Sequence, residues 1–361
     1  MKKETNEMKE NKIKKILDGG TVKAGPECDA AISSRVRIAR NFSDFPFPGR
    51  LDAGGRKKVV ELVNNAIKGK NGYDFIDFSA LSPLETSALM EKRAISPDFI
   101  KAPAEKELIT DAENGLYVMV NEEDHLRIQS IKPGFSISEA YEGACKFDDL
   151  ADESLSYAYD ENFGYLTQCP TNLGTGMRAS VMLHLPALTL GRKIQNIAAG
   201  LSKMGLTIRG FYGEGTEIGG DLYQVSNNIT LGISEEQTLD KIKNVAEKII
   251  ELERADRNEI MRSSKTALTD RIKRAYGTLK NAYMIQSSEF LQLYSAVRLG
   301  IACGIIKDID YALLDMLLAN AMPANLILRF AVSDDTAENR DILRAQYIQS
   351  SIGGEKGYDA G

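Results

Sequence analysis

The sequence predicts an α+β protein, in which a domain built on a mainly antiparallel sheet flanked by helices precedes an all-helical domain. Between residues 21 and 255, short apolar runs are separated by glycine-rich or charged turns, which is typical of antiparallel strands. From residue 256 to residue 350 only the helical apolar period occurs. A length of 361 residues, 43% of them hydrophobic and 27% charged, suits two folded domains.

The first domain follows a charged N-terminal segment, residues 1–20, which predicts only a marginal helix. Ser82 and Glu85 form a capping box with a proline at the first helical position, which predicts a helix to about Arg93. A later helix is expected to end before Gly205, a suitable C-terminal cap. Strands are expected around a charged corner and beyond it, at residues 116–120, 126–131, 179–185, 206–211, 221–225 and 229–233.

The change to a purely helical pattern begins at another capping box, formed by Ser234 and Gln237. Apolar residues then recur at helical spacing to about residue 349, and a glycine-rich tail follows. The expected organisation is therefore a charged segment, a sheet-containing domain, a helical domain and a disordered tail, over residues 1–20, 21–255, 256–350 and 351–361.

Charge and composition exclude several classes of function. The net charge of −6 disfavours a nucleic-acid surface that depends on bulk positive charge. No uncharged apolar run reaches the length of a membrane span, and the N-terminus has no apolar signal-peptide core, so we expect a cytoplasmic protein without a membrane partner. Four scattered cysteines and two histidines disfavour disulfides, a structural zinc site and a multi-histidine metal centre. The usual phosphate-binding loops are also missing.

Two short motifs carry charges that suit a reaction between an anion and a cation. In Ser33-Ser34-Arg35-Val36-Arg37 the two guanidinium groups fall on one side of a strand and could clamp phosphates, although a solvated basic strand has the same pattern. In Asn121-Glu122-Glu123-Asp124-His125-Leu126-Arg127 three consecutive carboxylates could orient or deprotonate a cationic substrate. An exposed acidic turn is the alternative interpretation of that second motif.

Two further motifs combine glycines with reactive groups. In the run from Cys169 to Arg178, CPTNLGTGMR, the glycines allow close approach of a ligand, and neighbouring threonine hydroxyls could stabilise a thiolate. A lone cysteine is more often a small buried apolar residue. The run from Arg209 to Gly215, RGFYGEG, carries an arginine and Glu214, and by itself it indicates only a flexible loop.

These four motifs occur in the same order in the phosphagen kinases, the superfamily of creatine and arginine kinases, and the resemblance spans roughly residues 25–250. Metabolic members carry a helical domain ahead of the SxRVR motif, whereas here that motif begins at Ser33 and the helical domain follows. This arrangement resembles the bacterial protein-arginine kinases. The sequence RDILRA, residues 340–345, also matches the RDxxRA phosphoarginine pocket of that family.

The resemblance implies phosphorylation of arginine side chains in proteins, with ATP and Mg²⁺ as cofactors and the metal held mainly by phosphates and water. By similarity, Glu123 is the catalytic base, Glu214 a second guanidinium clamp and Cys169 a thiolate on the same group. Glu122 and Asp124 are weaker candidates for contact with water on the metal. The implied nucleotide-binding residues are Ser33, Ser34, Arg35, Val36, Arg37, Arg127, Arg178, Ala179, Ser180, Val181, Met182, Arg209, Gly210, Phe211, Tyr212, Gly213 and Glu214. The implied allosteric phosphoarginine pocket comprises Arg340, Asp341, Ile342, Leu343, Arg344 and Ala345.

The resemblance also implies partners: protein substrates, a second copy of the chain or a larger assembly, a zinc-binding activator protein, and a Clp unfoldase–protease that degrades marked proteins in a stress response. One departure is Arg93, which occupies the place where many members carry a histidine near the nucleotide, and its role is not carried over. Two alternatives are a kinase for free arginine or another small guanidino compound, and an inactive adaptor that binds phosphoarginine. The intact Glu123, Cys169 and Glu214 argue against the adaptor.

Overall fold

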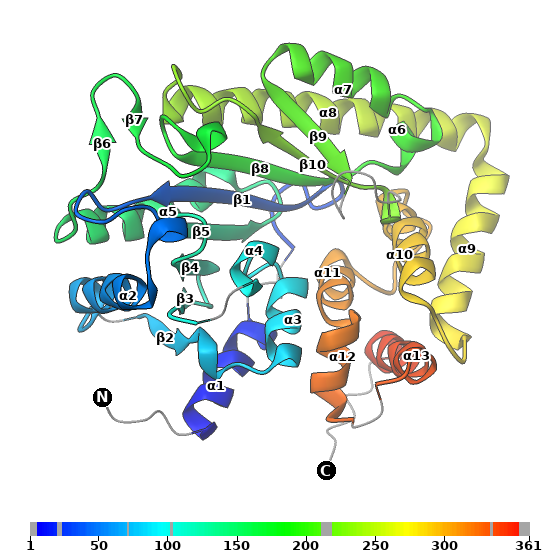
Figure 1. The fold of residues 1–361 in the computed structure, drawn as a ribbon. Helices are drawn as coiled ribbons and strands as arrows, with labels where there is room; N and C mark the ends of the chain where they lie inside the picture. The colour runs from blue at the N-terminus through cyan, green and yellow to red at the C-terminus, as the bar shows by residue number, and fades with distance from the viewer. Residues whose placement is uncertain are drawn as a thin grey trace.

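The computed structural model describes residues 6–19, 24–70, 72–101, 104–210, 219–332 and 335–353. Its centre is an eight-stranded antiparallel sheet in the order β2-β3-β4-β5-β1-β8-β10-β9 (Figure 1). A separate two-stranded hairpin is formed by β6 and β7. The strand bounds are β1 (Ala31–Arg40), β2 (Asp74–Asp77), β3 (Glu107–Asp111), β4 (Leu116–Val120), β5 (Leu126–Pro133), β6 (Tyr159–Asp160), β7 (Gly164–Tyr165), β8 (Met177–His184), β9 (Leu206–Gly210) and β10 (Leu222–Asn227).

The helices of the N-terminal part begin where capping side chains satisfy their first backbone N–H groups. Ser82 and Glu85 form the expected capping box of α3 (Pro83–Glu91), and Ser234 and Gln237 form that of α8 (Glu235–Ser263). The remaining helices of this part are α1 (Asn6–Asp18), α2 (Ala53–Ile67), α4 (Pro97–Ile100), α5 (Ile137–Asp152), α6 (Pro186–Leu190) and α7 (Ile194–Lys203), with 3₁₀ turns η1 (Pro48–Arg50), η2 (Phe78–Ala80), η3 (Pro170–Asn172) and η4 (Gly219–Asp221).

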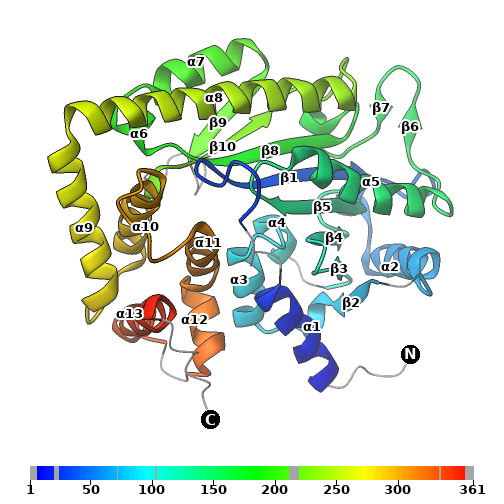
Figure 2. The same cartoon turned by 180° about the vertical axis from the view of Figure 1, so that it is seen from behind.

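The two faces of the sheet have opposite characters. On β1, Val36 and Ile38 point into an apolar core that α2, α5 and α8 complete on one face of the sheet (Figure 2). Side chains alternate along a strand, so Arg35 and Arg37 emerge on the other face. This alternation leaves a polar, arginine-bearing face open to the functional site.

The C-terminal helices close one end of that polar face. Their bounds are α9 (Lys265–Asn281), α10 (Ser287–Ala302), α11 (Tyr311–Asn320), α12 (Pro323–Phe330) and α13 (Ala337–Gly353). They share one apolar core with Ile32, Met182 and Leu222 of the sheet, and α12 packs against α3 (Figure 1). Among the described residues no single helix is long and apolar enough to span a membrane, and the bent pair α11–α12 passes that test by length and composition alone.

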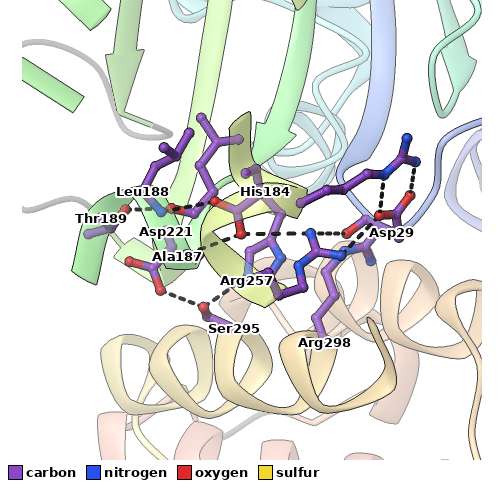
Figure 3. Close-up of polar contacts among 12 residues, drawn as sticks. Asp29, His184, Ala187, Leu188, Thr189, Asp221, Arg257, Ser295 and Arg298 are labelled. Atoms are coloured by element: carbon purple, nitrogen blue, oxygen red, sulfur yellow. Dashed lines mark hydrogen bonds and ion pairs between the residues drawn. The ribbon is translucent and has the colours of Figure 1, made fainter. Parts of the chain in front are cut away.

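A buried polar network joins the C-terminal helices to the sheet (Figure 3). His184 at the end of β8 lies 2.9 Å from the Ser295 hydroxyl of α10, and that hydroxyl donates a 2.5 Å hydrogen bond to Asp221. Burial, together with Arg298 and Arg257, holds the pKa of His184 well below its usual range, so the ring is neutral. Because the Ser295 hydroxyl gives its proton to Asp221, the His184 Nε2–H donates to Ser295. Arg257 of α8 binds Asp29, two residues before β1, at 3.0 Å. These contacts fix the chain just before the strand that carries Arg35 and Arg37.

One expected strand is not formed in the structure. Residues 229–233 form no strand, because Thr230 donates hydrogen bonds to the carbonyls of Thr171 and Leu173 instead of joining the sheet. The helix α8 runs through residue 255, the expected end of the first domain, and continues without a break to Ser263. The segment expected to be a disordered tail begins in α13, which ends at Gly353, and residues 354–361 lie outside the described residues.

Glu253 on α8 gives a stability prediction with a defined sign. Its fully buried carboxyl accepts hydrogen bonds from the N–H groups of Ala187 and Leu188 at the start of α6, and burial raises its pKa to about 7. The folded state therefore holds this proton at pH values where the unfolded state has released it. The free energy of unfolding should fall as pH rises from about 4.5 to about 7, by an amount on the order of 3 kcal/mol for this group.

Urea unfolding of Glu253→Gln at several pH values measures this contribution, because the variant cannot release the proton. The pH dependence should become shallower, with some slope remaining because burial also raises the pKa of Glu107 to about 7. Glu251→Gln, an exposed change two residues away on the same helix, is the matched control and should keep the wild-type slope. A wild-type slope in Glu253→Gln would mean that this carboxyl is already ionised in the folded state.

Candidate functional site

The sheet register brings the motif arginines together. Arg37 on β1 lies directly opposite Arg178 on β8, and Arg35 lies opposite Ser180. Directly paired residues of antiparallel strands share one face of a sheet, so these side chains emerge side by side. Arg127 enters from β5, on the other side of β1. Arginines from widely separated motifs therefore gather on the polar face.

The arginines crowd one another strongly. Burial, followed by the charges of Arg93, Arg127 and Arg178, lowers the pKa of Arg35 to about 9. Burial and neighbouring arginines hold the pKa of Arg37 well below its usual range, and its Nε is buried with no hydrogen-bond partner. A group of cations with so little compensating charge is suited to a polyanionic ligand.

Two of the three consecutive carboxylates between β4 and β5 are bound by the protein itself. Glu122 accepts two 2.8 Å hydrogen bonds from Arg127 and another from Ser96. Asp124 is buried and accepts hydrogen bonds from the Asn41 side chain at 2.7 Å and the Gln168 N–H at 2.8 Å. Both oxygens of Glu122 are therefore occupied, whereas Asp124 accepts its two hydrogen bonds through Oδ1 alone and also lines the cleft.

Glu123 lies between these two acids and lines an open cleft with Arg37, Arg127, Cys169 and Arg178. Burial raises the pKa of Glu123, and the adjacent charges of Asp124 and Glu122 raise it further. A raised pKa makes the carboxylate a better proton acceptor near neutral pH. His125 does not take part in this chemistry, because burial lowers its pKa to about 4 and its ring bridges the Phe42 N–H and the Pro46 carbonyl.

The loop that carries Cys169 depends on close backbone packing. Gly174 has a φ of 110°, and a Cβ there would lie 2.2 Å from the Thr230 carbonyl oxygen, so only glycine fits. The loop holds the Cys169 sulfur 3.1 Å from the Thr171 hydroxyl, at the edge of the cleft. The thiol is therefore placed beside both the acidic corner and Arg178.

The remaining candidates for nucleotide binding differ in whether their side chains face the cleft. Ser34, Val36, Ala179 and Val181 point away from the cleft or into the core, where Ser34 bonds Gly134 and Ser136, so they can offer a ligand only their backbone. Arg209 on β9 is close enough to lower the pKa of Arg178. Phe211, Tyr212, Gly213 and Glu214 lie outside the described residues, so the second clamp stays a prediction.

Arg93 is the residue that sequence reasoning left without a role. It sits in the turn after α3 with a φ of 60°, and its guanidinium reaches the Met182 sulfur at 3.1 Å and the Ser33 hydroxyl at 3.4 Å. Its charge is the first of those that lower the pKa of Arg35. The only signal in the sequence that pointed to Arg93 is that it occupies the place where many family members carry a histidine.

The RDILRA segment lies on α13, where its two arginines have different surroundings. Arg340 forms an ion pair with Asp335 at the surface. Arg344 is buried and donates to the carbonyls of Ala321 and Ile285, at 2.8 and 2.7 Å, and to Asp341 at 2.6 Å. Its Nη2 is buried with no hydrogen-bond partner. Arg344 therefore stabilises the fold through its Nε and Nη1.

Two family models match the chain: ATP:guanido phosphotransferase, C-terminal catalytic domain, over residues 56–256, and Protein-arginine kinase McsB C-terminal domain, over residues 265–359. A protein-arginine kinase of Caldanaerobacter subterraneus subsp. tengcongensis is 44% identical over 329 residues, which span 90% of this chain and 97% of the relative. Another, of Bacillus subtilis (strain 168), is 40% identical over 345 residues, 94% of each chain. The chain belongs to the protein-arginine kinase family.

A solved structure supports the same relationship. The crystal structure of lombricine kinase matches with a TM-score of 0.58 and 25% identity, over 66% of this chain and 70% of that one. Together with the family models, this match confirms the expected α+β fold, with its antiparallel sheet and helical C-terminal part, and the expected class of enzyme, a guanidino kinase of the protein-arginine kinase family.

Cysteine labelling tests the placement of Cys169. We expect Cys169 to react with iodoacetamide faster than the other three cysteines, because burial raises the pKa of Cys28 and Cys303 and raises that of Cys145 to about 11. A peptide containing arginine, added with MgATP, should protect Cys169 from labelling. Equal labelling rates at all four cysteines, measured by mass spectrometry, would favour a purely structural thiol.

Proposed function

We propose that this protein transfers the γ-phosphoryl group of ATP to arginine side chains of proteins. The observation that carries the proposal is the cleft in which acidic side chains, Glu123 among them, and the thiol of Cys169 lie beside a cluster of arginines. The arginines suit the triphosphate, whereas the carboxylate and the thiol suit a guanidinium group. The two charge types lie close enough for both substrates to meet in one cleft.

In the proposed reaction, a guanidinium nitrogen attacks the γ-phosphorus and the bond from that phosphorus to the bridging oxygen of ADP breaks. Glu123 takes the proton of the attacking nitrogen, which otherwise has a pKa above about 12 and no free lone pair. Cys169 and Glu214 hold the other guanidinium nitrogens. Arg35, Arg37, Arg127, Arg178 and Arg209 orient the phosphates and stabilise the charge that shifts onto ADP.

Mg²⁺ fits this cleft as a companion of the nucleotide. Among the described residues no group of three His, Cys, Asp or Glu side chains could hold a metal ion. Both oxygens of Glu122 are occupied and Asp124 is bonded through Oδ1, so the phosphates and water would supply most of the ligands of the ion. When bound, the ion neutralises phosphate charge.

Incubation with MgATP and a denatured, arginine-containing protein tests the function. Mass spectrometry under conditions that preserve acid-labile P–N bonds should find phosphoarginine in that protein, and free arginine should be a far poorer acceptor. Efficient phosphorylation of free arginine with none in the protein would favour a kinase for small guanidino compounds. No transfer to either acceptor would favour the adaptor function.

Residues 340–345 are proposed as a second site, which binds phosphoarginine and is linked to the state of assembly or activity. Arg340 and the free donor of Arg344 can bind the phosphoryl group, and Asp341 the attached guanidinium. Through resemblance to the family, the same proposal includes a homodimer or larger assembly and a zinc-binding activator. It also includes delivery to a Clp unfoldase–protease in a stress response, and a cytoplasmic location.

Arg340→Gln is the sharper test of this pocket. Replacing Arg344 by alanine would leave two buried carbonyls without donors and would destabilise the helical part. Arg340 is partly exposed, so Arg340→Gln should fold normally, keep ATP affinity and basal transfer, and lose at least about 10-fold in phosphoarginine affinity by calorimetry on the full chain. Wild-type phosphoarginine affinity would leave Arg340 with only its surface ion pair.

A further inference from the structure

The turn between α3 and α4 connects the C-terminal helices with the arginine cluster. Glu91 ends α3, Lys92 and Arg93 follow it in this turn, and each of the three contacts a different part of the molecule. Glu91 accepts hydrogen bonds at the start of α12, Lys92 binds the end of α11, and Arg93 reaches the strands of the nucleotide site. The segment from Glu91 to Arg93 is therefore bound to the C-terminal helices through Glu91 and Lys92, and its last residue, Arg93, reaches the functional site.

The Glu91 contact is specific. Its two carboxylate oxygens accept the backbone N–H groups of Ala324 and Asn325 at 2.9 and 3.0 Å, and the Asn325 side chain adds a third bond at 2.7 Å. A carboxylate is favourable there, because the first N–H groups of a helix lack partners within the helix. Lys92 adds a 2.7 Å hydrogen bond to the Asn320 side chain at the end of α11.

Arg93 depends on these contacts for its position. A φ of 60° is unusual for a residue with a side chain, so the surrounding contacts must hold the turn in this conformation. Within the site, the Gln129 side chain donates to the Arg93 carbonyl at 2.8 Å, and the Arg93 guanidinium reaches Ser33 and Met182. The guanidinium thus joins the cluster around Arg35.

We propose that Glu91 is a positioning residue of the nucleotide site: by binding the start of α12, it holds Arg93 where that guanidinium meets the phosphates. The inference rests on the proposed function, because the phosphates are those of ATP. The turn from Ala321 to Asn325 also receives the Arg344 guanidinium of α13, at the Ala321 carbonyl. A change in the position of the C-terminal helices would therefore alter the affinity for the nucleotide through Glu91 and Arg93.

A double-mutant cycle on the full chain tests this role. Glu91→Gln should raise the Kd for MgATP about 5-fold, measured by calorimetry, and leave the KM for an arginine-containing protein unchanged at saturating ATP. Arg93→Met should raise the Kd at least as much. If Glu91 acts through Arg93, adding Glu91→Gln to Arg93→Met should cause no further loss of affinity.

Glu85→Gln is the matched control. Glu85 lies on the same helix but hydrogen-bonds the start of that helix and Lys9, whereas Glu91 binds the start of α12. Glutamine can serve in the same capping box, so MgATP affinity should stay at the wild-type value. Equal losses from Glu91→Gln in the wild-type and Arg93→Met backgrounds would show a merely structural role and overturn the inference, as would unchanged affinity in Glu91→Gln. Wild-type protein that binds no MgATP would instead overturn the proposed function.

Discussion

Glu123→Gln is expected to lower kcat by about 10²–10⁴-fold, the usual worth of a general base, while MgATP binding is largely retained. Glutamine keeps the shape and most of the hydrogen bonding of the side chain but cannot accept the proton of the attacking nitrogen. Glu122 cannot replace it, because both of its oxygens already accept hydrogen bonds from Arg127. Steady-state kinetics with a protein substrate, together with calorimetry of MgATP binding, separate chemistry from nucleotide affinity.

The pH profile gives a second measure of the same role. Because burial and its acidic neighbours raise the pKa of Glu123, wild-type activity should fall on the acidic side at a higher pH than for an ordinary glutamate. That acidic limb should disappear in Glu123→Gln. Asp98→Asn, which alters another carboxylate lining the cleft, is the matched control and should change kcat less than about 3-fold. Near-wild-type turnover in Glu123→Gln would remove this residue from the base role.

Arg37→Met is expected to reduce turnover by about 10²–10³-fold, the loss typical of removing one preorganised donor to a developing negative charge. The stability of the protein without nucleotide should stay the same or rise. The reason is that Arg37 is a buried cation among other cations, with an Nε that has no hydrogen-bond partner. The increase in Tm that MgATP produces in the wild type should be lost.

Arg40→Met, the same substitution three residues further along β1, is the matched control. Arg40 binds Asp148 at 2.6 Å and lies 3.5 Å from the centre of the Tyr165 ring. Breaking this buried pair should cost about 3–5 kcal/mol of unfolding free energy. A Tm in Arg37→Met as low as that of Arg40→Met would indicate that Arg37 is a structural ion and not a phosphate ligand.

Much of the architecture could be predicted from local patterns. The capping boxes at Ser82 and Ser234 place the starts of α3 and α8, because the chemistry of a helix start is complete within four residues. The alternation in SSRVR places Arg35 and Arg37 on one face for the same local reason. The apolar pattern at residues 229–233 wrongly predicted a strand, because this segment hydrogen-bonds the Cys169 loop and does not pair with the sheet.

Within the candidate site, the sequence by itself determined which kinds of side chain are present: three consecutive acids, one cysteine beside threonines, and arginines in pairs. It could not determine that Ser96 binds Glu122, or that Asn41 and Gln168 bind Asp124, because these partners come from distant segments of the chain. Likewise, RDILRA indicated two arginines on one helix face. Only the tertiary structure buried Arg344 against carbonyls 23 and 59 residues away and brought Arg93 to Arg35, because burial and charge crowding depend on chain packing that no local pattern encodes.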